Sequence, residues 1–129
     1  MSQAGEATVT LFRPVGQKEL DLVEQSGWRR FPPRLPEQPI FYPVLNEQYA
    51  IEIARDWNTK ALNSGKVGFV LRFQVRQKFV ARYEPHIVGS RRHCEYWVPA
   101  EELNDFNDNI VGQIEVIHTF HGKDLSRDK

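Results

Sequence analysis

The chain has 129 residues, of which 40% are hydrophobic, 12% aromatic and 26% charged, and its 17 basic residues balance its 17 acidic ones. This length suits one ordinary domain, and the aromatic residues are numerous enough to build a core. A net charge of zero excludes the strong positive field that draws proteins to nucleic acid or to anionic membranes. The sequence therefore predicts a single domain over residues 1–129, with an ordered core over residues 8–120 and flexible ends.

No segment carries a targeting or membrane signal. The first ten residues lack the apolar stretch of a signal peptide, and no run approaches the roughly 20 apolar residues that span a bilayer. Cys94 is the only cysteine, which excludes an intrachain disulfide and a cysteine-based zinc site. We expect a cytoplasmic protein whose partners include neither membranes nor nucleic acid.

The first quarter of the chain predicts a strand followed by a helix. Residues 8–14 alternate between apolar and polar and end at Pro14, where a strand is expected to stop because proline lacks an N–H. Residues 16–28 predict a helix that ends at Gly27, in the left-handed position that suits glycine. Trp28 is expected to fold back over the last helical turn.

Five prolines in residues 31–43 predict a rigid, ordered connector rather than a free proline-rich ligand for another domain. Its interleaved apolar side chains are expected to be buried: Phe31, Leu35, Ile40, Phe41 and Tyr42. Residues 46–65 then predict the clearest helix, with Asn46 as its N-cap. Its core-facing stripe at helical spacing comprises Tyr49, Ala50, Ile53, Ala54 and Trp57.

The second half of the chain is richer in strands. Residues 67–75 predict a strand whose even-numbered side chains, from Gly68 to Gln74, lie on a partly wet face. An irregular strand broken at Pro85, a strand over 93–98, a short helix beginning at Pro99 and a last strand are expected next. The last strand covers residues 111–120. This order favours an α+β fold, a mainly antiparallel twisted sheet with two main helices and one short helix.

The predicted strand over 93–98 contains an unusual acid. Alternation puts His93, Glu95 and Trp97 on one face, and leaves Cys94 on the apolar face as a small core residue. A carboxylate between an imidazole and an indole is a candidate wall of a binding site. Such a carboxylate can stabilise an oxocarbenium-like transition state or hold a ribose hydroxyl. The alternative is that Glu95 lies on a solvated edge, or that it is paired with one of three arginines: Arg13, Arg91 or Arg92.

Other catalytic patterns are missing from the sequence. There is no glycine-rich phosphate loop, no HExxH and no serine in a G-x-S-x-G turn. The histidines are scattered along the chain: His86, His93, His118 and His121. We therefore expect no metal site, which needs three or four converging ligands.

Four segments, LFRPVG, FPPRLPEQPIFYPVLNEQYA, ARDWN and EYWVPAEEL, are similar to a family of small bacterial proteins loosely labelled "ADP-ribosylation / J-crystallin". The layout resembles ADP-ribosyltransferase-like domains. In these an Arg or His ends the first strand, a Ser, Thr or Tyr follows on a later strand, and a Glu lies on a strand near the C-terminal end. Arg13 matches the first position, Tyr42 and Asn46 are candidates for the second, and Glu95 matches the third.

This resemblance implies an ADP-ribosyltransferase-like fold that takes NAD as its substrate. Glu95 would be the catalytic residue that stabilises the ribosyl cation, and Arg13 would contact the pyrophosphate. Tyr42 or Trp97 would stack on the nicotinamide. The implied binding residues are Arg13, Tyr42, Asn46, His93 and Trp97. The arrangement requires Arg13 and Glu95 to line one shared hollow.

Two departures from the family pattern keep a second hypothesis open. The Ser-Thr-Ser type of motif is missing, and His93 stands where the family has Glu or Gln two residues before the catalytic Glu. One hypothesis is an NAD-dependent ADP-ribosyltransferase or NAD glycohydrolase. The other is a non-catalytic module that binds a small-molecule nucleotide or a protein partner. ADP-ribosylglycohydrolases, which are large and all-helical, do not match this short, strand-rich chain.

Overall fold

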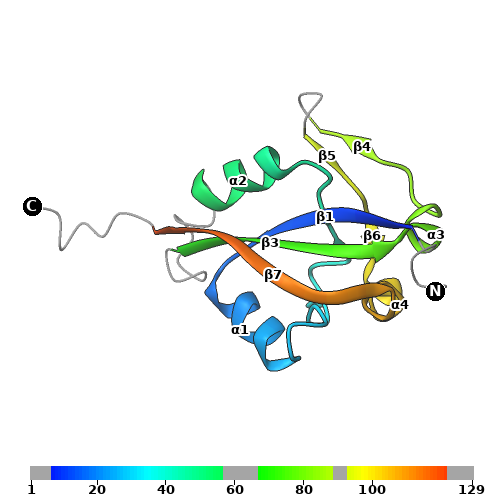
Figure 1. Cartoon of the computed structure of the whole chain (residues 1–129), viewed down its shortest axis with the longest axis horizontal. Helices are drawn as coiled ribbons and strands as arrows, with labels where there is room; N and C mark the ends of the chain where they lie inside the picture. Colours follow the sequence, from blue (N-terminus) through cyan, green and yellow to red (C-terminus); the bar gives the residue numbers. More distant parts are fainter. Residues whose placement is uncertain (1–6, 57–66, 89–92, 122–129) are drawn as a thin grey trace, which may run out of the picture.

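The main sheet has three antiparallel strands, with β3 (Val67–Arg76) between β1 (Thr8–Val15) and β7 (Ile110–His121) (Figure 1). The computed structural model describes residues 7–56, 67–88 and 93–121. Within these residues the chain is α+β with antiparallel sheets, as predicted. No helix among them is long and apolar enough to cross a membrane. The expected strands over 67–75 and 111–120 are confirmed, with slightly longer bounds.

The first strand does not stop at Pro14, as the sequence predicted, but continues to Val15. Phe12 uses both its backbone N–H and its C=O for hydrogen bonds to Val44, at 2.9 and 2.8 Å, on the side away from β3. Pro14 lies two residues further along and faces the same side, so its missing N–H removes no bond to β3.

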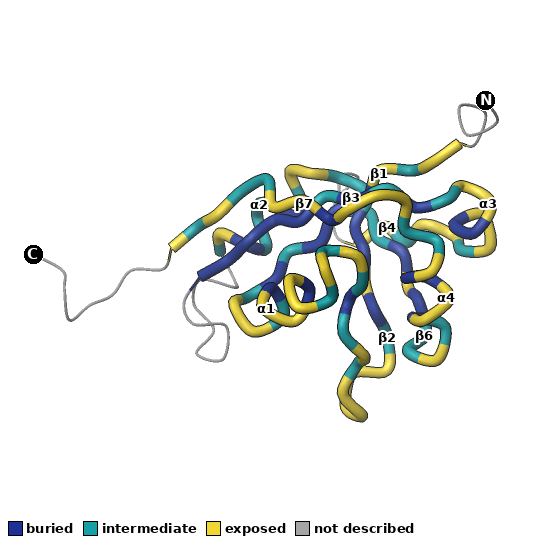
Figure 2. Tube along the Cα trace, turned by 60° about the horizontal axis from the view of Figure 1, so that its bottom comes forward, coloured by how far each residue is buried: buried dark blue, intermediate teal, exposed yellow. Residues whose placement is uncertain are grey.

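Two helices cover opposite faces of this sheet. Helix α1 (Gln17–Gln25) packs Leu20 and Val23 into the larger core, which includes Leu11 of β1. Helix α2 (Glu47–Asp56) packs Ala50 and Ala54 against the next residue of β1, Phe12, and against Val70 of β3. The face predicted to be partly wet is therefore dry at Val70, which is 0% exposed because α2 covers it. Figure 2 shows β3 buried along most of its length and exposed turns on α1.

The predicted end of the first helix at Gly27 and the predicted N-cap of the second helix at Asn46 are confirmed. Gly27 has φ of +80°, and the N–H groups of Gly27 and Trp28 donate to Glu24 and Val23, which satisfies two carbonyls of the last turn of α1. At the start of α2, the Asn46 side chain accepts a bond of 3.0 Å from the N–H of Tyr49. The part of the predicted helix beyond α2, including Trp57, lies outside the described residues.

The expected strand over 93–98 appears as two fragments, β5 (Cys94–Glu95) and β6 (Val98–Pro99). It faces β2 (Ile40–Phe41) and the residues that follow β2. Backbone bonds continue one antiparallel register beyond these fragments: Ala100 to Pro39, Tyr96 to Pro43 and Leu45 to Cys94. Pro39 and Pro43 cannot donate in return, so the ladder is interrupted although the two segments stay paired.

Val44 joins this ladder to the main sheet, since it bridges Phe12 on one side and Glu95 on the other. Beyond β5, strand β4 (His86–Ile87) adds a further antiparallel neighbour, with His86 opposite Glu95. The bridges thus place β5, which lies about 80 residues from β1 in sequence, one segment away from β1 in space, with Val44 between them.

The irregular strand expected over 79–88 is wrong for its first half, which lies partly in helix α3 (Gln77–Val80). Phe79 and Val80 are buried there. The expected short helix is confirmed as a 3-10 turn, Ala100–Glu102, that leads into α4 (Leu103–Asp108). Pro99 does not begin it but ends β6, with extended backbone at ψ of 144°.

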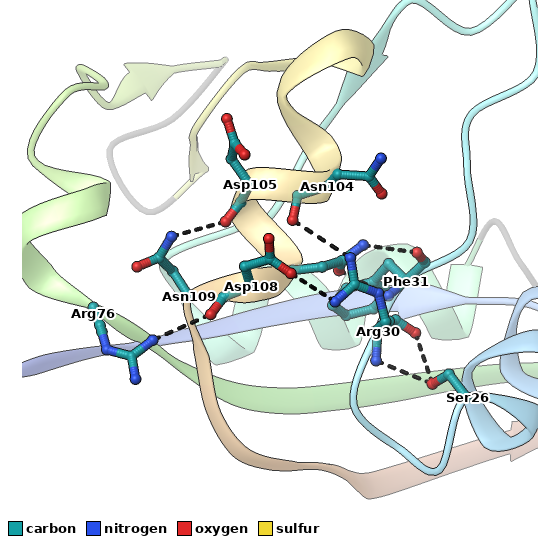
Figure 3. Close-up of polar contacts among 9 residues, drawn as sticks. Ser26, Arg30, Phe31, Arg76, Asn104, Asp105, Asp108 and Asn109 are labelled. Atoms are coloured by element: carbon teal, nitrogen blue, oxygen red, sulfur yellow. Dashed lines mark hydrogen bonds and ion pairs between the residues drawn. The ribbon is translucent and has the colours of Figure 1, made fainter.

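The proline-rich connector is ordered, and its anchor is Phe31. The buried Asn107 side chain accepts a bond of 2.9 Å from the N–H of Phe31 and donates one of 3.0 Å to its C=O. Nearby, Arg30 binds Asp108 and the carbonyl of Asn104, so α4 holds the connector at several points (Figure 3). The predicted burial is confirmed for Phe31 and Phe41. It is wrong for Leu35 and Tyr42, which are exposed, and Ile40 is half-buried.

We expect Asn107→Ala to destabilise the fold by about 2–3 kcal/mol, because it leaves two backbone groups of a buried Phe31 without partners. Urea unfolding followed by circular dichroism measures this change. Asn104→Ala is the matched control, since its exposed side chain lies on the same helix and should change stability by less than about 0.5 kcal/mol. Equal effects of the two variants would contradict the anchoring role of Asn107.

Candidate functional site

A groove of about 420 Å³ opens on the α2 side of the sheet. Its walls come from β1, the residues after β2, α2, the end of β4, and β5 with the residues that follow it. The lining residues are Arg13, Pro14, Tyr42, Val44, Ile53, Val88, Glu95 and Trp97. This volume lies within the range of ordinary small-molecule sites.

The register explains why Tyr42, Glu95 and Trp97 share this groove. Phe12, Val44 and Glu95 are directly paired across three neighbouring segments, so their side chains lie on the same face of the sheet. Alternation adds Tyr42 and Trp97 to that face. The face predicted from the sequence for Glu95 and Trp97 is therefore the one that borders the groove.

Glu95 is held by two neutral donors. The Tyr49 hydroxyl donates to one carboxylate oxygen at 3.2 Å, and the Trp97 indole N–H donates to the other at 2.9 Å. Burial, followed by the Glu95 charge and hydrogen bond, raises the pKa of Tyr49 to about 12. Tyr49 is therefore a protonated donor at neutral pH, and the carboxylate is fixed in one orientation with lone pairs still available.

Two aromatic rings present exposed surface beside Glu95. Trp97 is 43% exposed and Tyr42 is 39% exposed. His86 stacks on the Trp97 ring at 3.8 Å with an interplanar angle of 6°, and Tyr42 meets Trp97 edge-on at 6.4 Å. One face of Trp97 is thus covered by His86, and the indole is fixed both by this stack and by its bond to Glu95.

His93, which the sequence predicted as a binding residue, does not line the groove. Its ring stacks on Tyr49 at 4.4 Å, and its Nε2 lies 3.0 Å from a carboxylate oxygen of Glu52. His93 therefore supports the tyrosine that orients Glu95. Asn46, another predicted binding residue, caps α2 with its side chain and does not line the groove.

Arg13 borders the groove, but its guanidinium lies on the α1 side of the sheet. Its Nε and Nη2 donate to the two carboxylate oxygens of Glu19 at 2.6 and 2.9 Å. Its Cζ lies 4.5 Å from the centre of the buried Phe41 ring, and Nη1 reaches the Tyr42 carbonyl at 3.4 Å. Arg13 is thus one of the residues that line the groove, but its guanidinium and the Glu95 carboxylate point to opposite faces of the sheet.

Several residues around Glu95 were not singled out from the sequence. Tyr49 was assigned to the core-facing stripe of its helix, because helical spacing does not distinguish a core tyrosine from one whose hydroxyl reaches a neighbouring strand. His86 and Glu52 carry no local pattern, since their partners depend on strand pairing. Cys94 is a half-buried free thiol. Within the described residues, no three His, Cys, Asp or Glu side chains are grouped so as to hold a metal ion.

Comparison with protein-family models, with curated proteins and with solved structures found no significant match. The resemblance to ADP-ribosyltransferase-like domains therefore stays a prediction.

Tyr49 gives the site a signature at alkaline pH. The native state binds the Tyr49 proton more tightly than the unfolded chain, whose tyrosine has a pKa near 10.0. The stability that Tyr49 adds to the folded state through this tighter proton binding is therefore complete below pH 10 and is lost between about pH 10 and 12. We expect Tyr49→Phe to be less stable than the wild type at neutral pH but to lose less further stability as the pH rises. Urea midpoints measured from neutral pH upward test this, and parallel curves for the two proteins would contradict it.

Proposed function

We propose that the groove binds the nicotinamide end of NAD, or ADP-ribose, and that Glu95 assists cleavage or transfer at the nicotinamide ribose. The observation that supports this is the shared position of Tyr42, Glu95 and Trp97 in one groove, with the carboxylate oriented between two donors. In this proposal the chain is an ADP-ribosyltransferase-like domain.

The charge of the groove favours the oxidised nicotinamide ring. Among the described residues Glu95 accepts bonds only from the neutral donors Tyr49 and Trp97, and no cationic side chain forms an ion pair with it. Oxidised nicotinamide carries a positive charge, which a nearby carboxylate attracts. The exposed Trp97 ring adds a surface on which a flat cationic ring can stack.

The proposed reaction breaks the bond between the nicotinamide nitrogen and C1′ of the ribose. Nicotinamide leaves with the bonding electron pair, and positive charge develops on the ribose ring. Water or an acceptor nucleophile then attacks C1′ and loses a proton. The Glu95 carboxylate is held in one orientation before the reaction, so it would stabilise the developing charge without reorganising.

The variant Glu95→Gln tests this role, because it keeps the shape of the side chain and removes the negative charge. We expect release of nicotinamide from NAD to fall by roughly 100-fold or more, while the melting temperature stays nearly unchanged. Glu101→Gln is the matched control, since Glu101 is exposed and lies outside the groove lining. Equal turnover by the wild type and Glu95→Gln would remove Glu95 from the mechanism.

A non-catalytic module is the second candidate, and the state of Arg13 favours it. The ion pair with Glu19 occupies the Nε and Nη2 donors with which Arg13 was expected to contact a pyrophosphate. A groove of this kind could bind a nucleotide, or a protein partner, without promoting the reaction.

Calorimetry separates these possibilities. If the groove takes a cationic ring beside Glu95, oxidised NAD should bind more tightly than NADH, and Glu95→Gln should reduce this preference because it removes the charge that creates it. Binding of NAD without release of nicotinamide after long incubation favours the module. Absence of binding by NAD, NADH and ADP-ribose would contradict both nucleotide-based functions and direct attention to a protein partner.

A further inference from the structure

Arg34, in the proline-rich connector, carries a guanidinium with no hydrogen-bond or ion-pair partner among the residues that the structure describes. Its Nε is buried and makes no hydrogen bond to any of them. Arg34 as a whole is half-buried, and its two terminal nitrogens are not fully buried. The guanidinium therefore packs its inner edge against protein and leaves its outer fork accessible.

The surroundings of Arg34 contain more positive than negative charge. Arg34 and Arg13 both lie over the buried Phe41 ring, with their Cζ atoms 5.9 and 4.5 Å from its centre. Glu19 is the acid near both, and its two oxygens are bound by Arg13. Burial, and then the charge of Arg13, lowers the pKa of Arg34. Two guanidinium groups thus lie over one ring while the nearby carboxylate is bound by Arg13 alone, so the charge of Arg34 is not neutralised by an ion pair.

The backbone around Arg34 is restrained, which makes this geometry suitable for recognition. Pro33 precedes Arg34, and the residues after it form a turn closed by a bond of 2.8 Å from the Gln38 N–H to the Leu35 carbonyl. Proline fixes φ and reduces the number of backbone conformers. The fork of Arg34 therefore loses less conformational freedom on binding than an arginine on a flexible loop would.

Tyr42 connects this cation to the groove. Tyr42 lines the groove beside Glu95 and Trp97. It directly follows Phe41, over whose ring Arg34 lies, and its carbonyl accepts a bond of 3.4 Å from Arg13, which lies over the same ring. A ligand that extends from Trp97 past Tyr42 would meet negative charge at the Glu95 end and positive charge at the Arg34 end. A nicotinamide nucleotide has the matching order of charges, a cationic ring followed by phosphate groups.

We propose that Arg34 forms an anion-binding subsite at the Tyr42 end of the groove, which takes a phosphate group of the bound nucleotide through the two terminal nitrogens of the guanidinium. The subsite rests on the proposed function for the identity of the nucleotide. Arg34, rather than Arg13, is then the residue that supplies the free bidentate donor, since the fork of Arg13 is occupied by Glu19.

The test uses calorimetry with NAD, nicotinamide riboside, which has no phosphate, and pyrophosphate. We expect Arg34→Met to weaken the binding of NAD and of pyrophosphate roughly 10- to 100-fold, the range for a charge-assisted hydrogen bond. The affinity for nicotinamide riboside should stay unchanged. Arg34→Lys, which keeps the charge without the fork, should give an intermediate loss. Arg82→Met is the matched control, because Arg82 also lies over a phenylalanine ring, that of Phe79, but follows α3 outside the groove lining.

The outcomes distinguish this inference from the proposed function. Pyrophosphate binding that depends on Arg34, without any binding of NAD or the riboside, supports the subsite and overturns the proposed nucleotide. Equal weakening of NAD and the riboside by Arg34→Met assigns Arg34 a structural role and overturns the subsite. Unchanged NAD and pyrophosphate affinity in Arg34→Met, or failure of both to bind the wild type, overturns it as well. If Arg34→Met does not fold, the comparison of Arg34→Lys with the wild type decides the same question.

Discussion

The hydrogen bonds of Val44 are the constraint on which the arrangement of this protein depends. Val44 exchanges two backbone bonds with Phe12, at 2.9 and 2.8 Å, and bridges Glu95 on its other side. This link sets the register of the ladder between residues 39–45 and 94–100 relative to the main sheet. With it, the side chain of Glu95 lies on the same face as Phe12, and Glu95 lines the groove together with Ile53 of α2.

The same register separates the charged groups. Side chains alternate between faces along a strand, so neighbouring residues Phe12 and Arg13 point in opposite directions. Phe12 belongs to the smaller core under α2, whereas Arg13 reaches Glu19 of α1 across the Phe41 ring. Glu95 and Trp97 therefore lie on one face beside the groove, and the guanidinium of Arg13 lies on the other.

Much of the local structure was predictable because it depends on neighbours in sequence. Gly27 ends α1 and Asn46 caps α2 through bonds to residues within five positions. The errors occurred where distant residues decide. Pro14 remains in a strand because its missing N–H faces away from β3. Val70 is dry because α2 crosses it, and Tyr42 is exposed because the ladder turns it toward the groove rather than into the core.

By itself the sequence determined the α+β class, the end of α1, the N-cap of α2 and the face of Glu95 and Trp97, since periodicity and capping are short-range effects. Only the tertiary structure decided which groups meet. It brought Tyr49 to Glu95 and His86 onto Trp97, it paired Arg13 with Glu19, and among the described residues it left the buried Nε of Arg34 without a hydrogen-bond partner. Strand pairing between distant segments fixes these contacts, and the free energy of that pairing depends on the packed core rather than on any local pattern.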